Sequence, residues 1–150
     1  MGLGNTAESD LLKLFFQNTN WANLGDATGL RGSTTAGSFY ISLHTANPGQ
    51  TGNQTTSEAL YTSYTREAVA RSSGGWTISG SNPTSASNAA AISFPQCTGG
   101  SETETYFVVG RDSGTATGEI LFYGALTSSL AVSNNIIPQF AIGALVCTMQ

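Results

Sequence analysis

Few side chains in this 150-residue sequence have the types and spacing that could carry out catalysis. The single histidine, His44, could act as a base if the fold brought it next to a serine or to Cys97, because an adjacent imidazole activates a hydroxyl or thiol nucleophile. The sequence contains no Gly-x-Ser-x-Gly motif, which presents such a serine in many hydrolases. We therefore expect His44 to end a strand and to hydrogen-bond the turn that follows it.

Glu102 and Glu104 form a second arrangement with chemical potential. Residues two apart on a strand share a face and lie roughly 7 Å apart, a separation at which two carboxyl groups can hydrolyse a glycosidic bond with inversion. However, no cluster of aromatic residues that could stack on a sugar adjoins them. Alternating glutamate and threonine is more typical of a solvent-exposed edge strand, whose charges prevent pairing with other chains. We interpret the two glutamates in this way.

The candidate metal ligands do not form a recognisable motif. One histidine and two distant cysteines do not supply the four ligands of a zinc site, and no EF-hand spacing is present. A calcium site stays open as an alternative, because several oxygen-bearing side chains lie in or near predicted loops. These residues are Asp26, Asn47, Asn53, Glu58 and Asp112. We expect neither a bound metal nor a cofactor.

The two cysteines and the central arginines have structural interpretations. Cys97 and Cys147 could form a disulfide if two strands placed them together. We favour two buried thiols, in a protein made in a reducing cytosol. Arg66 and Arg71 lie on a predicted strand with glutamates nearby, which indicates ion pairs or subunit contacts in preference to ligand binding.

The composition is poor in charge. Charged residues make up 9% of the chain, against about 25% in ordinary globular domains. The net charge of −4 and the small number of basic residues argue against nucleic-acid binding. No apolar run approaches the eighteen or so residues of a membrane span. Because the cores of protein interfaces are depleted in charge, the composition favours a protein that works within an assembly.

The predicted elements are one helix followed by short strands. Thr6 can cap the helix, Glu8 and Asp10 complement the dipole of its first turn, and residues 11–16 form an apolar stripe. The helix is expected to end at the polar segment that begins with Asn18. Residues 25–37 and 81–88 have the composition of loops. Alternating or β-rich segments predict strands at residues 39–44, 64–72, 76–79, 89–94, 103–110, 120–126 and 141–149.

About seven or eight short strands separated by Gly, Ser, Pro and Asn turns predict an all-β fold. The expected architecture is an antiparallel β-sandwich, jelly-roll-like, with one short N-terminal α-helix. The length fits a single domain over residues 1–150. Within it, residues 1–24 form the helical segment and residues 38–150 the sandwich.

Four segments, taken in order, carry a resemblance to known proteins. They are ESDLLKLFF (8–16); YISLHTANPG (40–49) with YTREAVAR (64–71); GWTI (75–78) with AISFP (91–95); and ILFYGAL (120–126) with IPQF (137–140) and GAL (143–145). Together they resemble a family of small tailed-bacteriophage virion structural proteins, whose members are often described as tail-fibre or minor structural proteins.

The resemblance implies a structural virion protein and no enzyme. We expect a capsid cement or decoration protein, which stabilises contacts between major capsid subunits, because the chain lacks the repeats or coiled coil of a fibre shaft. The alternative is a tail-associated fibre or baseplate module that binds a host receptor or glycan. The expected partners are the major capsid protein and copies of the chain itself, with no nucleic acid and no membrane. The expected location is the capsid surface of the virion, after synthesis in the host cytoplasm.

Two groups of residues are candidates for contacts between subunits. Large aromatic side chains at and after the helix could reach a neighbour, as could the polar loop that follows the Pro-Gly turn at residues 48–49. The candidate contact residues are Phe15, Phe16, Trp21, Gln50, Asn53 and Thr55.

Overall fold

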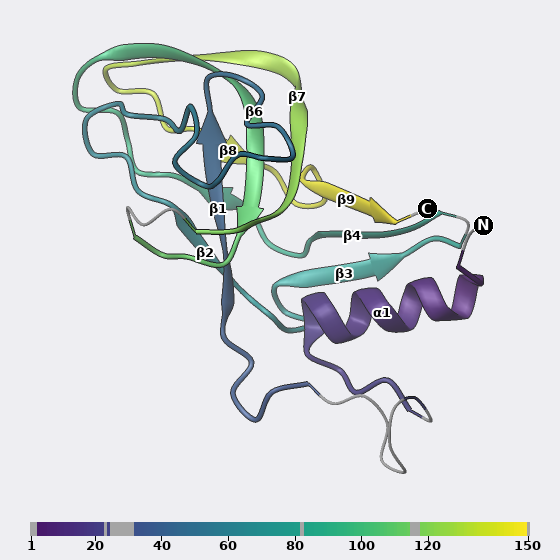
Figure 1. Ribbon diagram of the computed structural model, residues 1–150. Coiled ribbons are helices and arrows are strands. Elements are labelled where there is room, and N and C mark those ends of the chain that lie inside the picture. The colour runs from purple at the N-terminus through teal and green to yellow at the C-terminus, as the bar shows by residue number, and fades with distance from the viewer. Residues whose placement is uncertain (1–2, 23, 25–31, 82, 115–117, 150) are drawn as a thin grey trace. The chain divides into compact units, whose positions relative to one another are not determined.

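The structure is a computed structural model that describes residues 3–22, 24, 32–81, 83–114 and 118–149. Within these residues the chain forms one helix and nine strands, most of which are labelled in Figure 1. They are α1 (Asn5–Gln17), β1 (Ser38–His44), β2 (Glu67–Ala70), β3 (Trp76–Ser79), β4 (Thr84–Asn88), β5 (Ile92–Ser93), β6 (Ser101–Gly110), β7 (Ile120–Ser133), β8 (Gln139–Phe140) and β9 (Val146–Met149).

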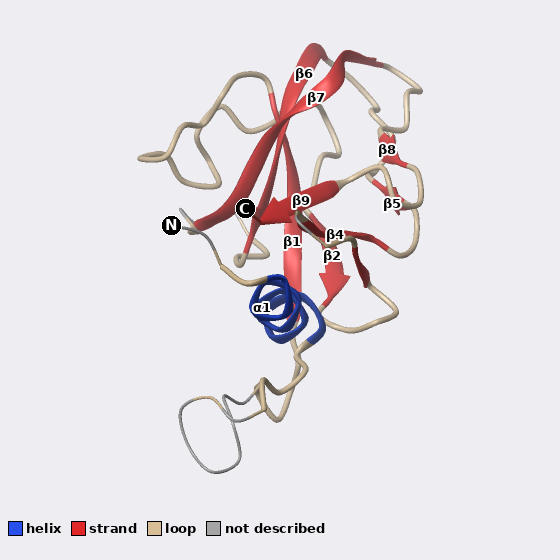
Figure 2. Cartoon of the chain, turned by 90° about the vertical axis from the view of Figure 1, so that its right-hand side faces the viewer, coloured by secondary structure: helices blue, strands red, loops and turns tan. Residues whose placement is uncertain are grey.

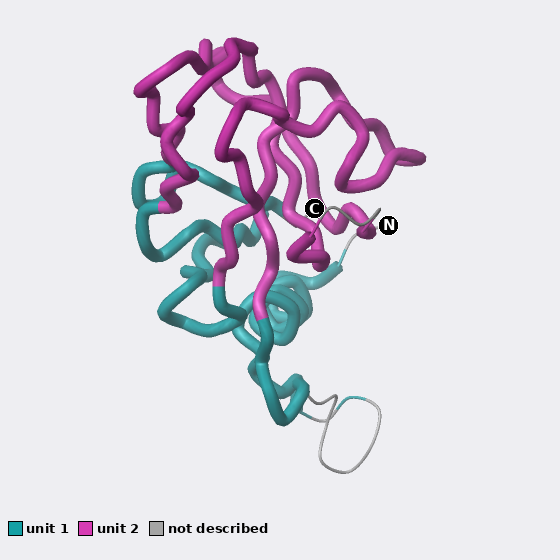
Figure 3. The backbone as a smooth tube through the Cα atoms, turned by 90° about the vertical axis from the view of Figure 1, so that its left-hand side faces the viewer, with its two compact units in different colours: residues 1–37, 70–91, 140–150 teal, residues 38–69, 92–139 magenta. Residues whose placement is uncertain are grey.

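The chain divides into two compact units, each built from separate stretches of sequence (Figure 3). Unit 1 contains residues 1–37, 70–91 and 140–150, and unit 2 contains residues 38–69 and 92–139. Unit 1 holds α1 and a three-stranded sheet in the order β3-β4-β9. Unit 2 holds the four-stranded sheet β2-β1-β6-β7, apart from the last residue of β2, and a further two-stranded sheet pairs β5 with β8.

The helix forms where the sequence predicts it, but with a different cap. Gly4, in extended backbone, is the N-cap and makes no side-chain hydrogen bond, so the predicted cap Thr6 lies inside the first turn. Glu8 lies in the first turn as predicted, yet it is buried and its carboxylate accepts a hydrogen bond from the Thr84 hydroxyl at 3.2 Å. Asn18 ends the helix with a φ of 56°, a left-handed conformation that asparagine tolerates well.

The apolar face of the helix forms the core of unit 1. Leu12 and Phe16 are buried, and the ring centroids of Phe16 and Trp76 lie 4.6 Å apart in an edge-to-face contact. The Gln17 side chain donates to the Trp76 carbonyl at 2.9 Å, which fixes the end of the helix on the start of β3. The predicted spacing of apolar residues in the helix therefore selects the face that packs.

The centre of the three-stranded sheet is a strand that the sequence analysis assigned to a loop. Apart from Thr84, β4 consists of small and polar residues with low intrinsic β propensity. It nevertheless pairs antiparallel with β3 on one side and with β9 on the other. Burial of Thr84, Ala86 and Asn88 on one face follows the two-residue period of a strand, so the tertiary environment determines its conformation.

β6 is an inner strand of the four-stranded sheet, antiparallel to both β1 and β7. Figure 2 shows β6 and β7 side by side along much of their length. The interpretation of this segment as an exposed edge strand is wrong for Glu104, which is buried. Glu102 and Glu104 both pair with β7, whereas the pairing of β6 with β1 covers Tyr106 to Gly110. The pairing of β6 with β7 also shifts in register between Glu104 and Tyr106.

The predicted all-β class is confirmed, with antiparallel sheets and a single short helix in the described residues. The strands are distributed over sheets of four, three and two. Within the described part of the chain, no helix is long and apolar enough to cross a membrane. Part of the predicted loop at 25–37, residues 25–31, lies outside the described residues.

We predict that Phe16→Ala lowers the free energy of unfolding by about 3–5 kcal/mol, because truncation of a fully buried aromatic side chain leaves a cavity in the core. The neighbouring Phe15 is half-buried, so Phe15→Ala is the matched control and should have a smaller effect. Urea unfolding monitored by the fluorescence of Trp76 and Trp21 measures the free energy of unfolding of both variants. Equal and small losses would contradict the assignment of Phe16 to the core.

Candidate functional site

The last residue of β1, His44, is fully buried at 0% exposure. Its Nδ1 lies 2.9 Å from the Thr56 carbonyl oxygen, and its Nε2 lies 2.8 Å from Ser42 Oγ. Because a carbonyl oxygen only accepts, Nδ1 carries the hydrogen and Nε2 accepts one from Ser42. Burial lowers the pKa of His44, which favours this neutral form. The prediction that His44 ends a strand and hydrogen-bonds the following segment is confirmed.

The contact between Ser42 and His44 has the composition of a nucleophile and its base, but both side chains are buried. In catalytic triads a carboxylate orients the second imidazole nitrogen. Here that nitrogen donates to a backbone carbonyl instead. The arrangement fastens the loop at residues 45–58 onto the end of β1.

Gln54 fastens the same loop from within. Its side chain is fully buried, and its Oε1 accepts a hydrogen bond from the Asp112 backbone at 3.0 Å. The Gln54 backbone N–H donates to the Gly118 carbonyl at 2.9 Å. A Cβ atom at Gly110 or Gly118 would overlap the Gln54 amide, so both positions need a residue without a side chain.

A buried ion pair lies next to this loop. Arg66 binds Glu58 through Nε–Oε1 at 2.7 Å and Nη2–Oε2 at 2.8 Å, and the two side chains are 2% and 11% exposed. Arg66 Nη1 also donates to the Asp112 carbonyl at 2.9 Å. The Tyr64 hydroxyl donates to Glu58 at 3.2 Å and accepts from the Leu43 N–H at 3.1 Å. Arg66 is therefore part of an ion pair, as the sequence predicts.

Arg71 binds the end of the helix. Its guanidinium donates to three backbone carbonyls, those of Leu14, Phe15 and Ala36. Two of these carbonyls belong to the last turn of α1, which lacks intrahelical partners for such groups. A cation is also favourable at this negative end of the helix dipole.

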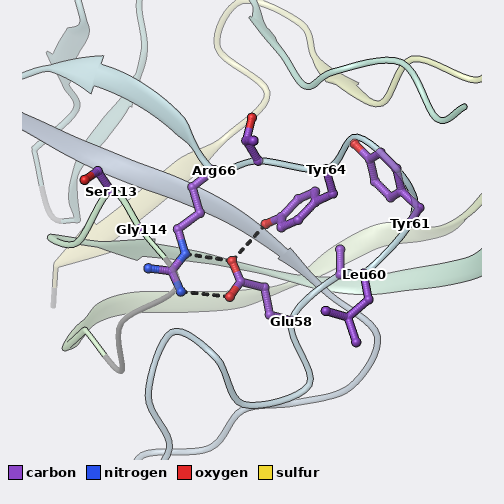
Figure 4. Close-up of a pocket in the computed structure, with 9 residues that line it drawn as sticks. Glu58, Leu60, Tyr61, Tyr64, Arg66, Ser113 and Gly114 are labelled. Atoms are coloured by element: carbon purple, nitrogen blue, oxygen red, sulfur yellow. Dashed lines mark hydrogen bonds and ion pairs between the residues drawn. The ribbon is translucent and has the colours of Figure 1, made fainter.

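A pocket of about 310 Å³ opens beside the ion pair (Figure 4). Its volume is at the lower end of the range for small-molecule sites. The rings of Tyr61 and Tyr64 lie 5.2 Å apart edge to face, and Tyr64 also stacks on Phe94, so both rings take part in internal packing. The pocket is lined by Glu58, Ala59, Leu60, Tyr61, Tyr64, Thr65, Arg66, Ser113 and Gly114.

Glu102 holds one wall of this pocket. Its Oε1 accepts hydrogen bonds from the backbone N–H groups of Leu60 at 2.9 Å and Tyr61 at 2.8 Å. The Leu60 side chain is 85% exposed at the pocket wall, whereas Tyr61 is buried. The alternating sequence of β6 singles out Glu102 as a candidate, but this sequence does not indicate its backbone partners, which lie more than 40 residues earlier in the chain.

The structure separates the six residues predicted to contact another subunit. Phe16 is buried against Trp76, so its surface is already used within the chain. Phe15 and Trp21 are half-buried in unit 1, whereas Gln50 and Thr55 are exposed in unit 2. Asn53 is half-buried and its Oδ1 accepts from the Thr55 N–H at 2.9 Å. A subunit contact stays a prediction for Phe15, Trp21, Gln50, Asn53 and Thr55.

Several of the oxygen-bearing side chains considered as calcium ligands form hydrogen bonds or an ion pair within the chain. Asn47 and Asp112 each accept a hydrogen bond from the backbone N–H two residues further on. Glu58 belongs to the buried ion pair. Asp26 lies outside the described residues. Within the residues that are described, no three His, Cys, Asp or Glu side chains are grouped so that they could hold a metal ion.

The two cysteines are free thiols, as the favoured prediction stated. Cys97 belongs to unit 2 and Cys147 to unit 1, and both are buried. Burial raises the pKa of Cys147 to about 12, so this thiol is neutral at physiological pH and packs as a small apolar group.

We predict that Arg66→Met lowers the free energy of unfolding by about 3–5 kcal/mol at pH 7, because it leaves the Glu58 carboxylate buried without its counter-charge. The double variant with Glu58→Gln should recover part of this loss. Arg111 and Glu119 form an exposed ion pair, so Arg111→Met is the matched control and should change stability little. Urea unfolding measures all three, and similar values for Arg66→Met and Arg111→Met would refute the assignment.

The pKa of His44 predicts a loss of stability in acid. The folded protein binds a proton on His44 only below the ordinary pKa of 6.5, whereas the unfolded chain binds it at 6.5. Stability therefore falls as pH drops below 6.5, by up to about 1.4 kcal/mol per pH unit. His44→Gln should lack this component. The free energies of unfolding of the wild-type protein and of His44→Gln are measured from pH 7.5 to 5, and their difference separates the His44 contribution from that of the carboxylates. If the two free energies change with pH in parallel, the prediction is contradicted.

The comparison with known families agrees with the resemblance seen in the sequence. The matching family model is described as podophage GP4 fiber I protein gp80, and it matches residues 2–148. No curated protein matches the chain. The match covers both compact units, including the buried ion pair and the pocket. The chain therefore belongs to the podophage GP4 fiber I protein gp80 family.

Proposed function

We propose that this protein is a non-catalytic structural component of a podophage tail fibre. The proposal rests on the family match over residues 2–148, because the family is described as a podophage fibre protein. As a member of this family, the chain is a bacteriophage structural protein associated with the virion. The fibre role fits the family description better than a place on the capsid surface, which the sequence analysis had put first.

The internal use of the reactive side chains supports a structural role. His44 and Ser42 are buried, Glu58 and Arg66 neutralise each other, and Glu102 binds two backbone N–H groups. Each of these groups stabilises a loop of unit 2. They contribute rigidity, which a part of a mechanical assembly requires, and the proposal assigns them no reaction.

The composition of the surface supports a role in which the protein contacts other proteins of an assembly. Large apolar side chains are exposed in both units, among them Leu60 and Ile137 in unit 2 and Ile142 and Val146 in unit 1. Few charges are available to keep neighbouring molecules apart, since only 9% of residues are charged. The proposed partners are copies of the chain and other virion proteins. Nucleic acid and membranes are not among them.

A capsid cement protein is the second candidate function. The same exposed apolar side chains and low charge content favour it, because a cement protein covers junctions between major capsid subunits. In that case the major capsid protein is the principal partner. The two candidates place the chain on different parts of the particle.

The decisive experiment locates the protein in the virion. Particles from a host that carries the phage are separated into complete virions, tailless heads and released tail complexes, and each fraction is probed by quantitative mass spectrometry. The fibre proposal predicts a constant ratio to tail proteins and loss from tailless heads. A constant ratio to the major capsid protein, with retention on tailless heads, overturns it and supports the cement role. The major capsid protein and a tail protein serve as internal controls.

A further inference from the structure

Glu104 occupies an environment that is unusual for a carboxyl group. It lies on the inner strand β6, opposite Leu130 of β7, and is 0% exposed. Neither of its carboxyl oxygens accepts a hydrogen bond from a donor group of the described residues. Burying an ionised carboxylate without a partner is so unfavourable that the group takes up a proton instead. The environment therefore requires a neutral acid at this position.

Glu102 lies two residues before Glu104 and hence on the same face of β6. It is half-buried, and its Oε1 accepts the hydrogen bonds from the N–H groups of Leu60 and Tyr61. Glu102 and Glu104, which we term the carboxyl pair, therefore combine one group that accepts two backbone hydrogen bonds with one that must be neutral.

The groups around the carboxyl pair provide no compensating positive charge within the described part of the chain. Burial, followed by the charge of Glu102 and a side-chain hydrogen bond with Glu102, raises the pKa of Glu104 to about 8. Burial also raises the pKa of Tyr61, as do the nearby Glu104, Cys97, Glu102 and Glu67. On β7 the facing residues are Leu130 and Val132, which carry no charge. The acidic and neutral neighbours all favour the protonated form of Glu104.

We propose that the carboxyl pair is a pH-sensitive device that holds the Leu60–Tyr61 wall of the pocket. With Glu104 neutral, Glu102 keeps its charge and binds the two N–H groups. Loss of the Glu104 proton to solvent base creates a second negative charge beside the first, inside a region of low polarity. The wall of the pocket is released as the repulsion is relieved.

Glu102 is the member of the pair that moves. Glu104 is fully buried, and its backbone is fixed by the register with β7. Glu102 is half-buried and already reaches outward to the loop, so rotation into water solvates its charge at little steric cost. Its departure leaves the N–H groups of Leu60 and Tyr61 without their acceptor. The exposed Leu60 side chain then moves with its backbone.

The carboxyl pair also affects global stability. In the unfolded chain a glutamate ionises near its ordinary pKa of 4.5, whereas folded Glu104 keeps its proton up to about pH 8. Between these values the folded protein binds the additional proton, so stability falls as pH rises through this window. This trend is opposite in sign to that of His44, and the two effects overlap below pH 6.5.

The test follows the amide hydrogens that Glu102 binds. Hydrogen exchange of the full chain is measured by NMR at pH 6.5 and pH 9.5 and converted into protection factors, which correct for the pH dependence of the intrinsic rate. The N–H groups of Leu60 and Tyr61 should lose at least tenfold in protection at the higher pH. The Gln54 N–H, bound to the Gly118 carbonyl in the same unit, is the control and should stay unchanged. Constant protection of Leu60 and Tyr61 overturns the proposal.

Two variants assign the effect to the pair. Glu104→Gln keeps the shape but cannot ionise, so the loss of protection at pH 9.5 should disappear, and its persistence would overturn the proposal. Cys97→Ser removes the neighbouring thiol and should still show the loss of Leu60 and Tyr61 protection at pH 9.5. If protection stays constant in this variant, the loss is due to Cys97, and the proposal is overturned. If Glu104→Gln does not fold, the carboxyl ¹³C shift of Glu104 in the native protein decides. It should titrate with a midpoint above 7, and a midpoint below 6 overturns the proposal.

Discussion

The bidentate ion pair between Arg66 and Glu58 is the interaction on which unit 2 depends most. Glu58 follows the loop that returns from β1 and forms a bridge with His44, Arg66 immediately precedes β2, and the Asp112 carbonyl bound by Arg66 follows β6. Three connections of the sheet therefore meet at one guanidinium. A buried pair of this kind contributes little net energy compared with an apolar substitute, but the loss of either partner leaves an unpaired charge. It thus selects one arrangement of the loops over others.

The structure uses several of its scarce ionisable side chains inside the molecule. Glu8, Glu104 and Arg66 are buried, and Arg71 binds carbonyls at the end of the helix. Since the chain has five basic and nine acidic residues in all, the outer surface has even fewer charges than the composition suggests. Hydroxyl, amide and apolar groups remain to face the surroundings. Such a surface suits the permanent contacts with other virion proteins that the proposed fibre role requires.

The elements that could be predicted from the sequence are those whose own residues show a period. The stripe at residues 11–16 marks the buried face of α1, and the alternation in β1 and β6 marks two strands of unit 2. β4 could not be predicted, because its Ser and Asn residues become a strand only between β3 and β9. The site was predictable in part. His44 and Arg66 have partners of the expected kind, but Gln54 and Glu104 owe their roles to burial by distant segments.

The interleaving of the two units has a consequence for how the chain is made. The backbone passes between them at residues 37–38, 69–70, 91–92 and 139–140. During synthesis, unit 2 has all its residues once Gln139 has left the ribosome. Unit 1 must wait for β9, which supplies one edge of its sheet and pairs with β4. Until β9 has left the ribosome, the chain thus carries an incomplete three-stranded sheet with β4 unpaired on one side.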